Sequence, residues 1–193
     1  MVATTRLATP LTPTKYRLNV EQYYKMAEVG ILGLEQRTEL IDGEIIEMSA
    51  IGTKHAICVS NLSEILTLRT IQIAHVRQQN PVHLSDRSEP QPDIALVKRP
   101  SSLYVDCHPK AADIFLLIEV SDSTLKYNRE IKVPLYAKAG IPEVWIANIE
   151  EQVFEVYKSP NQDRYEQVQL YGKGELIPMS MFADIAIAVD EIF

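Results

Sequence analysis

Apolar side chains in the middle of the chain form two continuous runs rather than an alternating pattern. The runs are IALV at residues 94–97 and IFLLI at residues 114–118. Continuous runs rich in Ile, Val and Leu are typical of strands that are buried on both faces of a sheet. We therefore predict two central strands. If they pair antiparallel through the long connection at residues 99–112, the start of the first lies beside the end of the second.

The N-terminal part of the chain has the capping and turn signals of a short helix followed by a hairpin. Asn19 and Gln22 have the spacing of a capping box, which opens a helix over VEQYYKMAEV that Gly30 ends. Asp42-Gly43 then separates the short strands ELI and EIIEM. This dipeptide is the strongest short-range signal for a two-residue hairpin.

Two further helices are predicted on either side of the central runs. Residues 53–69 have a helical apolar period, and residues 71–82 continue as strand material. The apolar face of the first helix comprises Ile57, Leu62, Ile65, Leu66 and Leu68. Residues 121–140 begin with turn and cap residues and end with Gly140, so they predict a helix behind the sheet. Pro134 lies beyond the first turn of this helix and predicts a kink or a late helix start.

The C-terminal part adds more strands. IPEVWIANI reads as a buried strand, and VFEVYKS and YEQVQLY form a hairpin across residues 160–164. We expect residues 185–193 to pack onto the body through Ile185, Ile187, Val189, Ile192 and Phe193. The order helix, strand, strand, strand, helix, strand predicts a mixed central sheet flanked by helices, an α/β (α+β) fold with an extra N-terminal hairpin and extra C-terminal strands.

Composition predicts a single globular unit. The 193 residues are 46% hydrophobic and 23% charged, which suits one core, and we expect a single domain at residues 18–193. Residues 1–17 are rich in Thr and Pro, and we expect a flexible tail there. The sequence has neither an apolar run of about 20 residues nor a signal-peptide h-region, so we expect a cytoplasmic protein without a membrane span. Cys58 and Cys107 fit neither a disulfide framework nor zinc spacing.

The charge is unevenly distributed along the chain. The net charge is -7, which is unusual for a protein that binds nucleic acid. Residues 69–138 hold 10 Lys and Arg against 8 Asp and Glu, whereas the remainder holds 9 against 18. The middle segment is thus the electropositive part of an acidic protein. Chance scatter on a solvated surface explains this asymmetry equally well.

Two carboxylates stand at the ends of the central runs. Asp93 opens the first strand and Glu119 closes the second, so antiparallel pairing makes them neighbours. A carboxylate at the edge of an apolar core needs a partner, because leaving it unpaired costs several kcal/mol. Two oxygen ligands on rigid strands suit magnesium, which keeps several waters. The alternative is structural: Asp93 caps a turn, and Glu119 pairs with a nearby cation.

The helix that follows supplies cations close to these carboxylates. Lys126, Arg129 and Lys132 lie in its first half, and its start follows Glu119 directly. At least one of them can reach back over the carboxylate pair, either to bind a phosphate or to orient an attacking water. This combination favours a catalytic site over an ordinary ion pair.

These segments carry a family resemblance. PDIALV, IEVSDST and YNREIKVPLYAKAGIPEVWI, together with ELIDGEIIEMS and a following histidine, resemble the Uma-two family, whose members are assigned as restriction endonucleases of the PD-(D/E)XK nuclease superfamily. The resemblance covers residues 18–189. It implies that Asp93 and Glu119 bind the metal. Ser121 stands where the superfamily motif has lysine, and the resemblance implies that Lys132 takes over that role.

The resemblance also names accessory positions. It places the N-terminal hairpin near the site, which makes Glu39 a candidate third acid, although an ordinary strand residue is an equally good interpretation. The family motif also has a histidine at the position of His55, which would otherwise be interpreted as a local hydrogen-bond donor. Asn128 replaces the aspartate of the family pattern, and it can cap or orient but cannot supply a negative charge.

The leading hypothesis is a Mg²⁺- or Mn²⁺-dependent endodeoxyribonuclease with DNA as its partner. A non-catalytic nucleic-acid-binding or scaffolding relative is the alternative that Asn128 favours, and a hydrolase for another phosphodiester stays open. We expect a homodimer, with residues 153–171 in the interface, because cutting both strands of a duplex calls for two sites. We also expect Lys132→Met to leave folding and metal binding nearly intact while reducing turnover by orders of magnitude.

Overall fold

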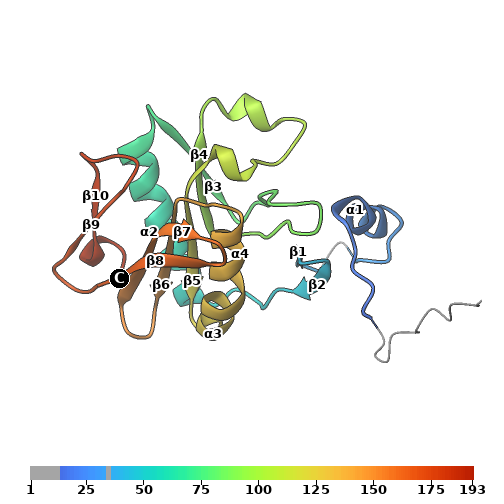
Figure 1. The fold of residues 1–193 in the computed structure, drawn as a ribbon. Coiled ribbons are helices and arrows are strands. Elements are labelled where there is room, and N and C mark those ends of the chain that lie inside the picture. Colours follow the sequence, from blue (N-terminus) through green and yellow to red (C-terminus); the bar gives the residue numbers. More distant parts are fainter. Residues whose placement is uncertain (1–13, 34–35) are drawn as a thin grey trace, which may run out of the picture.

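A six-stranded sheet forms the centre of the molecule (Figure 1). The computed structural model describes residues 14–33 and 36–193. The strand order is β3-β4-β5-β6-β7-β8; β5 and β6 are parallel and the other neighbours are antiparallel. The strands are β3 (Ala74–Gln78), β4 (Ile94–Lys98), β5 (Ile114–Ser121), β6 (Glu143–Asn148), β7 (Val153–Asn161) and β8 (Arg164–Tyr171). The predicted mixed sheet is thereby confirmed.

The two central apolar runs pair as predicted. Strands β4 and β5 are antiparallel, with Ile94 opposite Ile118 and Leu96 opposite Leu116. All four apolar residues of β4 are buried, which explains the continuous apolar sequence: alternate side chains serve two different cores. The parallel partner β6 is buried along its whole length and continues both cores.

Helices and a small hairpin cover the two faces of the sheet. On one face, α2 (Thr53–Thr70) packs with the C-terminal hairpin of β9 (Leu176–Pro178) and β10 (Ala186–Ala188). On the other face lies α4 (Val133–Lys138), which follows α3 (Leu125–Tyr127) through a π-helical turn at Asn128–Lys132. Short 3₁₀ helices are Ser101–Tyr104, Ala111–Asp113 and Val189–Glu191. The last residues pack into the first core, as predicted.

Two predictions were wrong in part: the apolar face of α2 and the length of the strand that follows it. Ile57 is 63% exposed and Leu68 is 70% exposed, because the side chains that face the sheet are those of Cys58, Leu62 and Leu66 on the neighbouring stripe of the helix. Of residues 71–82, only those of β3 form a strand, since pairing with β4 ends at Gln78 opposite Ile94.

The N-terminal hairpin is held against the body by backbone hydrogen bonds. It consists of β1 (Thr38–Ile41) and β2 (Glu44–Glu47) and follows α1 (Val20–Glu28), whose capping box is present as predicted. Gly43 has φ +76°, and a Cβ there would lie 2.8 Å from the Leu18 carbonyl oxygen, so the turn requires glycine. Gly43 N donates to Arg87 O at 2.7 Å, and Glu89 N donates to Leu40 O at 2.8 Å. The hairpin thereby has a fixed place beside the sheet.

The cysteines, the helices and the N-terminal segment were also the subject of expectations. Cys58 is buried and Cys107 is exposed, and both are free thiols. In the described part of the chain, no helix is long and apolar enough to cross a membrane. The expected tail at residues 1–17 lies largely outside the described residues, which begin at residue 14; from there, Lys15 and Arg17 form ion pairs with Glu44.

Candidate functional site

Asp93 and Glu119 lie side by side on adjacent strands. Asp93 immediately precedes β4, and the register that pairs Ile94 with Ile118 brings Asp93 opposite Glu119. Directly opposed residues of an antiparallel pair point to the same face, here the face that α4 covers. Both side chains are buried. The prediction that the two acids are neighbours on adjacent strands therefore agrees with the register.

Three donors hold the Asp93 carboxylate in place. Val120 N donates to Oδ2 at 2.8 Å, Gln79 Nε2 donates to Oδ1 at 3.1 Å, and His55 Nε2 lies 3.1 Å from the same Oδ1. Burial alone would raise the pKa of Asp93, but these hydrogen bonds and the charge of His55 lower it below its ordinary value. Asp93 is therefore an ionised, oriented carboxylate at neutral pH.

Glu119 is in a different electrostatic situation. Burial raises its pKa to about 7; the Lys132 charge acts in the opposite direction, and the charges of Asp93 and Glu39 add to the increase. The hydroxyl of Tyr136 donates to Oε1 at 2.5 Å, and Lys132 Nζ lies 3.1 Å from Oε1 and 3.3 Å from Oε2. Glu119 thus shares the Lys132 ammonium group with Glu39, whereas Asp93 has His55 as its partner.

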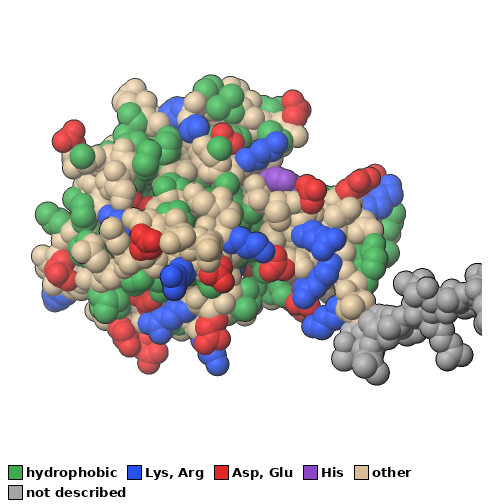
Figure 2. All heavy atoms as spheres, in the orientation of Figure 1, with side chains coloured by type: hydrophobic (Ala, Val, Ile, Leu, Met, Phe, Trp, Pro, Cys, Tyr) green, Lys and Arg blue, Asp and Glu red, His purple; other side chains and the backbone are tan. Residues whose placement is uncertain are grey.

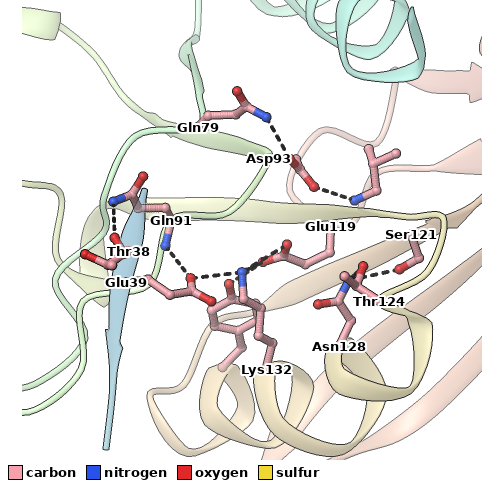
Figure 3. Close-up of polar contacts among 12 residues, drawn as sticks. Thr38, Glu39, Gln79, Gln91, Asp93, Glu119, Ser121, Thr124, Asn128 and Lys132 are labelled. Carbon is pink, nitrogen blue, oxygen red and sulfur yellow. Dashed lines mark hydrogen bonds and ion pairs between the residues drawn. The ribbon is translucent and has the colours of Figure 1, made fainter. Parts of the chain in front are cut away.

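Lys132 lies between two of these acids (Figure 3). Its Nζ contacts Glu39 Oε2 at 3.1 Å as well as Glu119, and the residue is only 4% exposed. Burial opposes its charge, but the attraction of Glu119 and Glu39 outweighs burial and raises the pKa of Lys132. The buried ion pairs argue against the expectation that Lys132→Met leaves folding nearly intact, because the substitution would leave two buried carboxylates without their cation.

The π-helical turn explains why Lys132 points into the site. Pro134 has no N–H, and its ring crowds the carbonyl four residues earlier, so the regular helical bond pattern cannot run through this segment. The chain forms a wider turn at Asn128–Lys132 instead, and Asn128 and Lys132 are its buried residues. Such turns are common at functional sites. The predicted irregularity before Pro134 takes this form.

Asn128 and Ser121 contact one another. Asn128 Nδ2 donates to Ser121 Oγ at 2.9 Å, and both side chains are buried. This bond ties the start of the π-helical turn to the end of β5 and so helps to fix the distance between Lys132 and Glu119. The two accessory candidates thus have a structural contact beside the acids.

Glu39 and His55 line the same cleft and come from different elements. Glu39 extends from β1, and its Oε2 also accepts a hydrogen bond from Gln91 N at 3.0 Å. His55 extends from the first turn of α2. The cleft has a volume of about 260 Å³, and its lining includes Glu39, His55, Asp93, Glu119, Asn128 and Lys132. The structure therefore brings together the predicted catalytic and accessory residues, with Ser121 behind Asn128.

Three residues that support these acids were not predicted from the sequence. Tyr136 lies one helical turn after Lys132, a spacing that would have placed its ring on the same face. Gln79 has φ +48°, and its backbone N–H donates to Asp93 O at 3.0 Å. Gln91 donates through Nε2 to Thr38 O at 2.8 Å and so fixes β1 beside the sheet. Nothing in the local sequence marks either glutamine.

One face of the molecule is of mixed charge. Figure 2 shows Lys and Arg side chains interspersed with Asp and Glu on one face, without a continuous positive area. Within the described residues, no group of three or more His, Cys, Asp or Glu side chains is arranged to hold a metal ion. Lys132 lies between Glu39 and Glu119, and Asp93 stands opposite Glu119 on the adjacent strand.

The mixed sheet, the acids on adjacent strands and the buried lysine on the following helix define a protein of the restriction-endonuclease-like class. A family model described as "Putative restriction endonuclease" (Uma2) matches residues 20–190, and the chain belongs to this family. Membership of the family supports a nuclease function.

A solved structure supports the same fold. It is described as "a putative nuclease belonging to DUF820 from Anabaena variabilis ATCC 29413", with a TM-score of 0.73 and 19% sequence identity. The similarity covers 91% of this chain and 97% of that one. At this identity the likeness shows the fold alone. No curated protein has a significant match to the chain.

Proposed function

We propose that this protein is a metal-dependent endodeoxyribonuclease that hydrolyses DNA phosphodiester bonds. The observation that carries the proposal is the Lys132 ammonium group, buried within 3.1 Å of Glu119 Oε1 beside the neighbouring acid Asp93. A lysine and two acids on adjacent strands are the groups that phosphodiester hydrolysis needs in one cleft. Asp93 and Glu119 are the proposed metal ligands, and Lys132 completes the proposed catalytic set.

The residues present fit a divalent cation. Carboxylate oxygens are the ligands that Mg²⁺ and Mn²⁺ prefer, and Mg²⁺ is commonly held by one or two carboxylates together with waters. The cluster contains more carboxylates than ammonium groups, and burial raises the pKa of Glu119 to about 7. A bound divalent cation would offset this excess of buried negative charge. When bound, it would lower the pKa of a water and polarise a phosphate oxygen.

The protein side chains have separate roles in this proposal. Asp93 is oriented by Val120 N, Gln79 and His55, so one ligand is placed before anything binds. Lys132 keeps its charge and can donate hydrogen bonds to an attacking water or to the phosphate oxygens, where charge develops in the transition state. Glu39 accepts from Lys132 and so limits where its ammonium group can lie.

Double-stranded DNA is the proposed substrate, and a homodimer is the proposed assembly. One chain offers one such site, so cutting both strands of a duplex in one encounter calls for two chains related by a twofold axis. The edge strand β8 exposes Val168 and Leu170, which are 53% and 67% accessible. This exposed apolar pair supports the placement of the interface on the hairpin of β7 and β8. The cytoplasm is the compartment we propose for this activity.

A non-catalytic DNA-binding relative is the second candidate. The observation that favours it is that Lys132 forms ion pairs with two acids at once, which a divalent cation would have to compete with. In that case Asn128, which bonds to Ser121, would be part of a protein that retains the fold for DNA binding without catalysis.

The experiment that separates these functions is metal-dependent nicking of supercoiled plasmid DNA by the purified protein. Cleavage with Mg²⁺ or Mn²⁺ that EDTA abolishes is expected, and Glu119→Gln should abolish it as well. Lys132→Arg, which keeps the charge but not the shape, is the matched variant for the lysine. DNA binding without cleavage on duplex, single-stranded and branched substrates would favour the second candidate.

A further inference from the structure

Two residues that line the cleft each have a buried polar atom without a hydrogen-bond partner. Across the described residues, the buried side-chain atoms without a partner are His55 Nδ1, Arg77 Nε and Tyr127 Oη. Buried polar groups are nearly always hydrogen-bonded, so each exception requires an explanation. The Arg77 guanidinium stacks on the ring of Tyr104 at 5.7 Å. His55 and Tyr127 both line the cleft of the candidate site.

Tyr127 lies at the point where α3 passes into the π-helical turn. Its ring is half-buried, and its hydroxyl is close enough to Glu39, Lys132 and Glu119 to respond to their charges. Burial raises the pKa of Tyr127 to about 12, and the two acids add to this increase. The hydroxyl is therefore protonated at neutral pH and is available as a hydrogen-bond donor.

The acids of the cleft do not use this donor. Glu119 accepts from Tyr136 and Lys132, and Glu39 accepts from Gln91 N and Lys132. Tyr136, by contrast, does bind a carboxylate, since its hydroxyl donates a hydrogen bond to Glu119 Oε1 at 2.5 Å. Tyr127 also lines the cleft, but its buried hydroxyl has no hydrogen-bond partner among the described residues.

We propose that the Tyr127 hydroxyl binds the DNA substrate directly, by donating a hydrogen bond to a non-bridging oxygen of the phosphate that enters the cleft. This assignment rests on the proposed nuclease function and adds a substrate-contacting residue to it. A phosphodiester oxygen is a charged acceptor, and hydrogen bonds to charged groups are stronger than neutral ones. A bound phosphate would also supply the hydrogen-bond acceptor that the Tyr127 hydroxyl lacks within the protein.

The test is Tyr127→Phe, which keeps the ring and removes only the hydroxyl. Binding is measured by fluorescence anisotropy with a labelled DNA duplex and Ca²⁺ in place of Mg²⁺, and cleavage is measured separately with Mg²⁺. We expect Kd to rise and kcat/KM to fall by about 10-fold or more. The melting temperature should not fall, because the hydroxyl has no partner to lose. Tyr104→Phe, whose hydroxyl donates to Lys98 O outside the cleft, is the control and should change neither quantity.

The outcomes separate this assignment from the proposed function. If the parent protein binds and cleaves DNA and Tyr127→Phe does so equally well, the Tyr127 assignment is overturned and the nuclease function stands. A Tyr127→Phe protein that melts lower but keeps the parent Kd would show a structural bond instead, and would also overturn the assignment. A parent protein that neither binds nor cleaves any DNA would overturn both.

Discussion

Replacing Lys132 by methionine tests the electrostatic account of the site. The Lys132 ammonium lies 3.1 Å from both Glu39 Oε2 and Glu119 Oε1, and all three side chains are buried. Methionine has a similar length but no charge, so the two carboxylates would face each other uncompensated. Removing one partner of a buried ion pair costs about 3–5 kcal/mol in free energy of unfolding. For a chain of this size, the melting temperature should fall by about 6–20 °C.

The loss should depend on pH. Burial raises the pKa of Glu119 to about 7, and the Lys132 charge counteracts part of that increase, so removing Lys132 raises this pKa further. Well below pH 7 Glu119 is protonated and needs no cation, whereas above pH 7 its charge must be offset. The stability difference between Lys132→Met and the parent should therefore be larger at pH 8 than at pH 5.5.

Urea unfolding followed by tryptophan fluorescence is the suitable assay. Trp145 is the only tryptophan and is fully buried in β6, so its emission reports on the core. Lys126→Met, on the same helical segment but exposed, is the matched control and should change stability by less than about 0.5 kcal/mol. Equal stability of Lys132→Met and the parent at pH 8 would refute the buried ion pairs and the charge argument for the site.

Three further predictions concern metal, pH and assembly. Mg²⁺ or Mn²⁺ should raise the melting temperature of the parent, and Glu119→Gln should remove most of that gain; an unchanged metal response would place the ion elsewhere. Mn²⁺ affinity measured by calorimetry should fall as pH drops below about 7, approaching about tenfold per pH unit, since the raised pKa of Glu119 requires a proton to leave; a flat profile would exclude Glu119 as a ligand. Light scattering should show a dimer, and Leu170→Lys on exposed β8 should shift it towards monomer; a parent that is monomeric with and without DNA would contradict this.

The sequence by itself determined most of the secondary structure around the site. Strands buried on both faces require apolar residues at every position, so β4 and β5 could be recognised from their runs. Their antiparallel pairing then fixed Asp93 beside Glu119, because opposed residues share a face. The hairpin at Asp42-Gly43 was equally predictable, since only a few residue pairs adopt the positive φ angles of its turn.

Only the tertiary structure decided which helix faces meet the sheet. A π-helical turn holds an extra residue, and each residue rotates a helix by about 100°, so regular 3.6-residue spacing does not fix where Lys132 points. Whether Ile57 or Cys58 of α2 faced the core depended likewise on how that helix lies on the sheet. Contacts with residues distant in sequence place Gln79 and Gln91 beside the acids. Tyr127 differs from them in that its hydroxyl has no partner among the described residues. Such long-range neighbours leave no periodic signal, because they are set by packing rather than by local conformation.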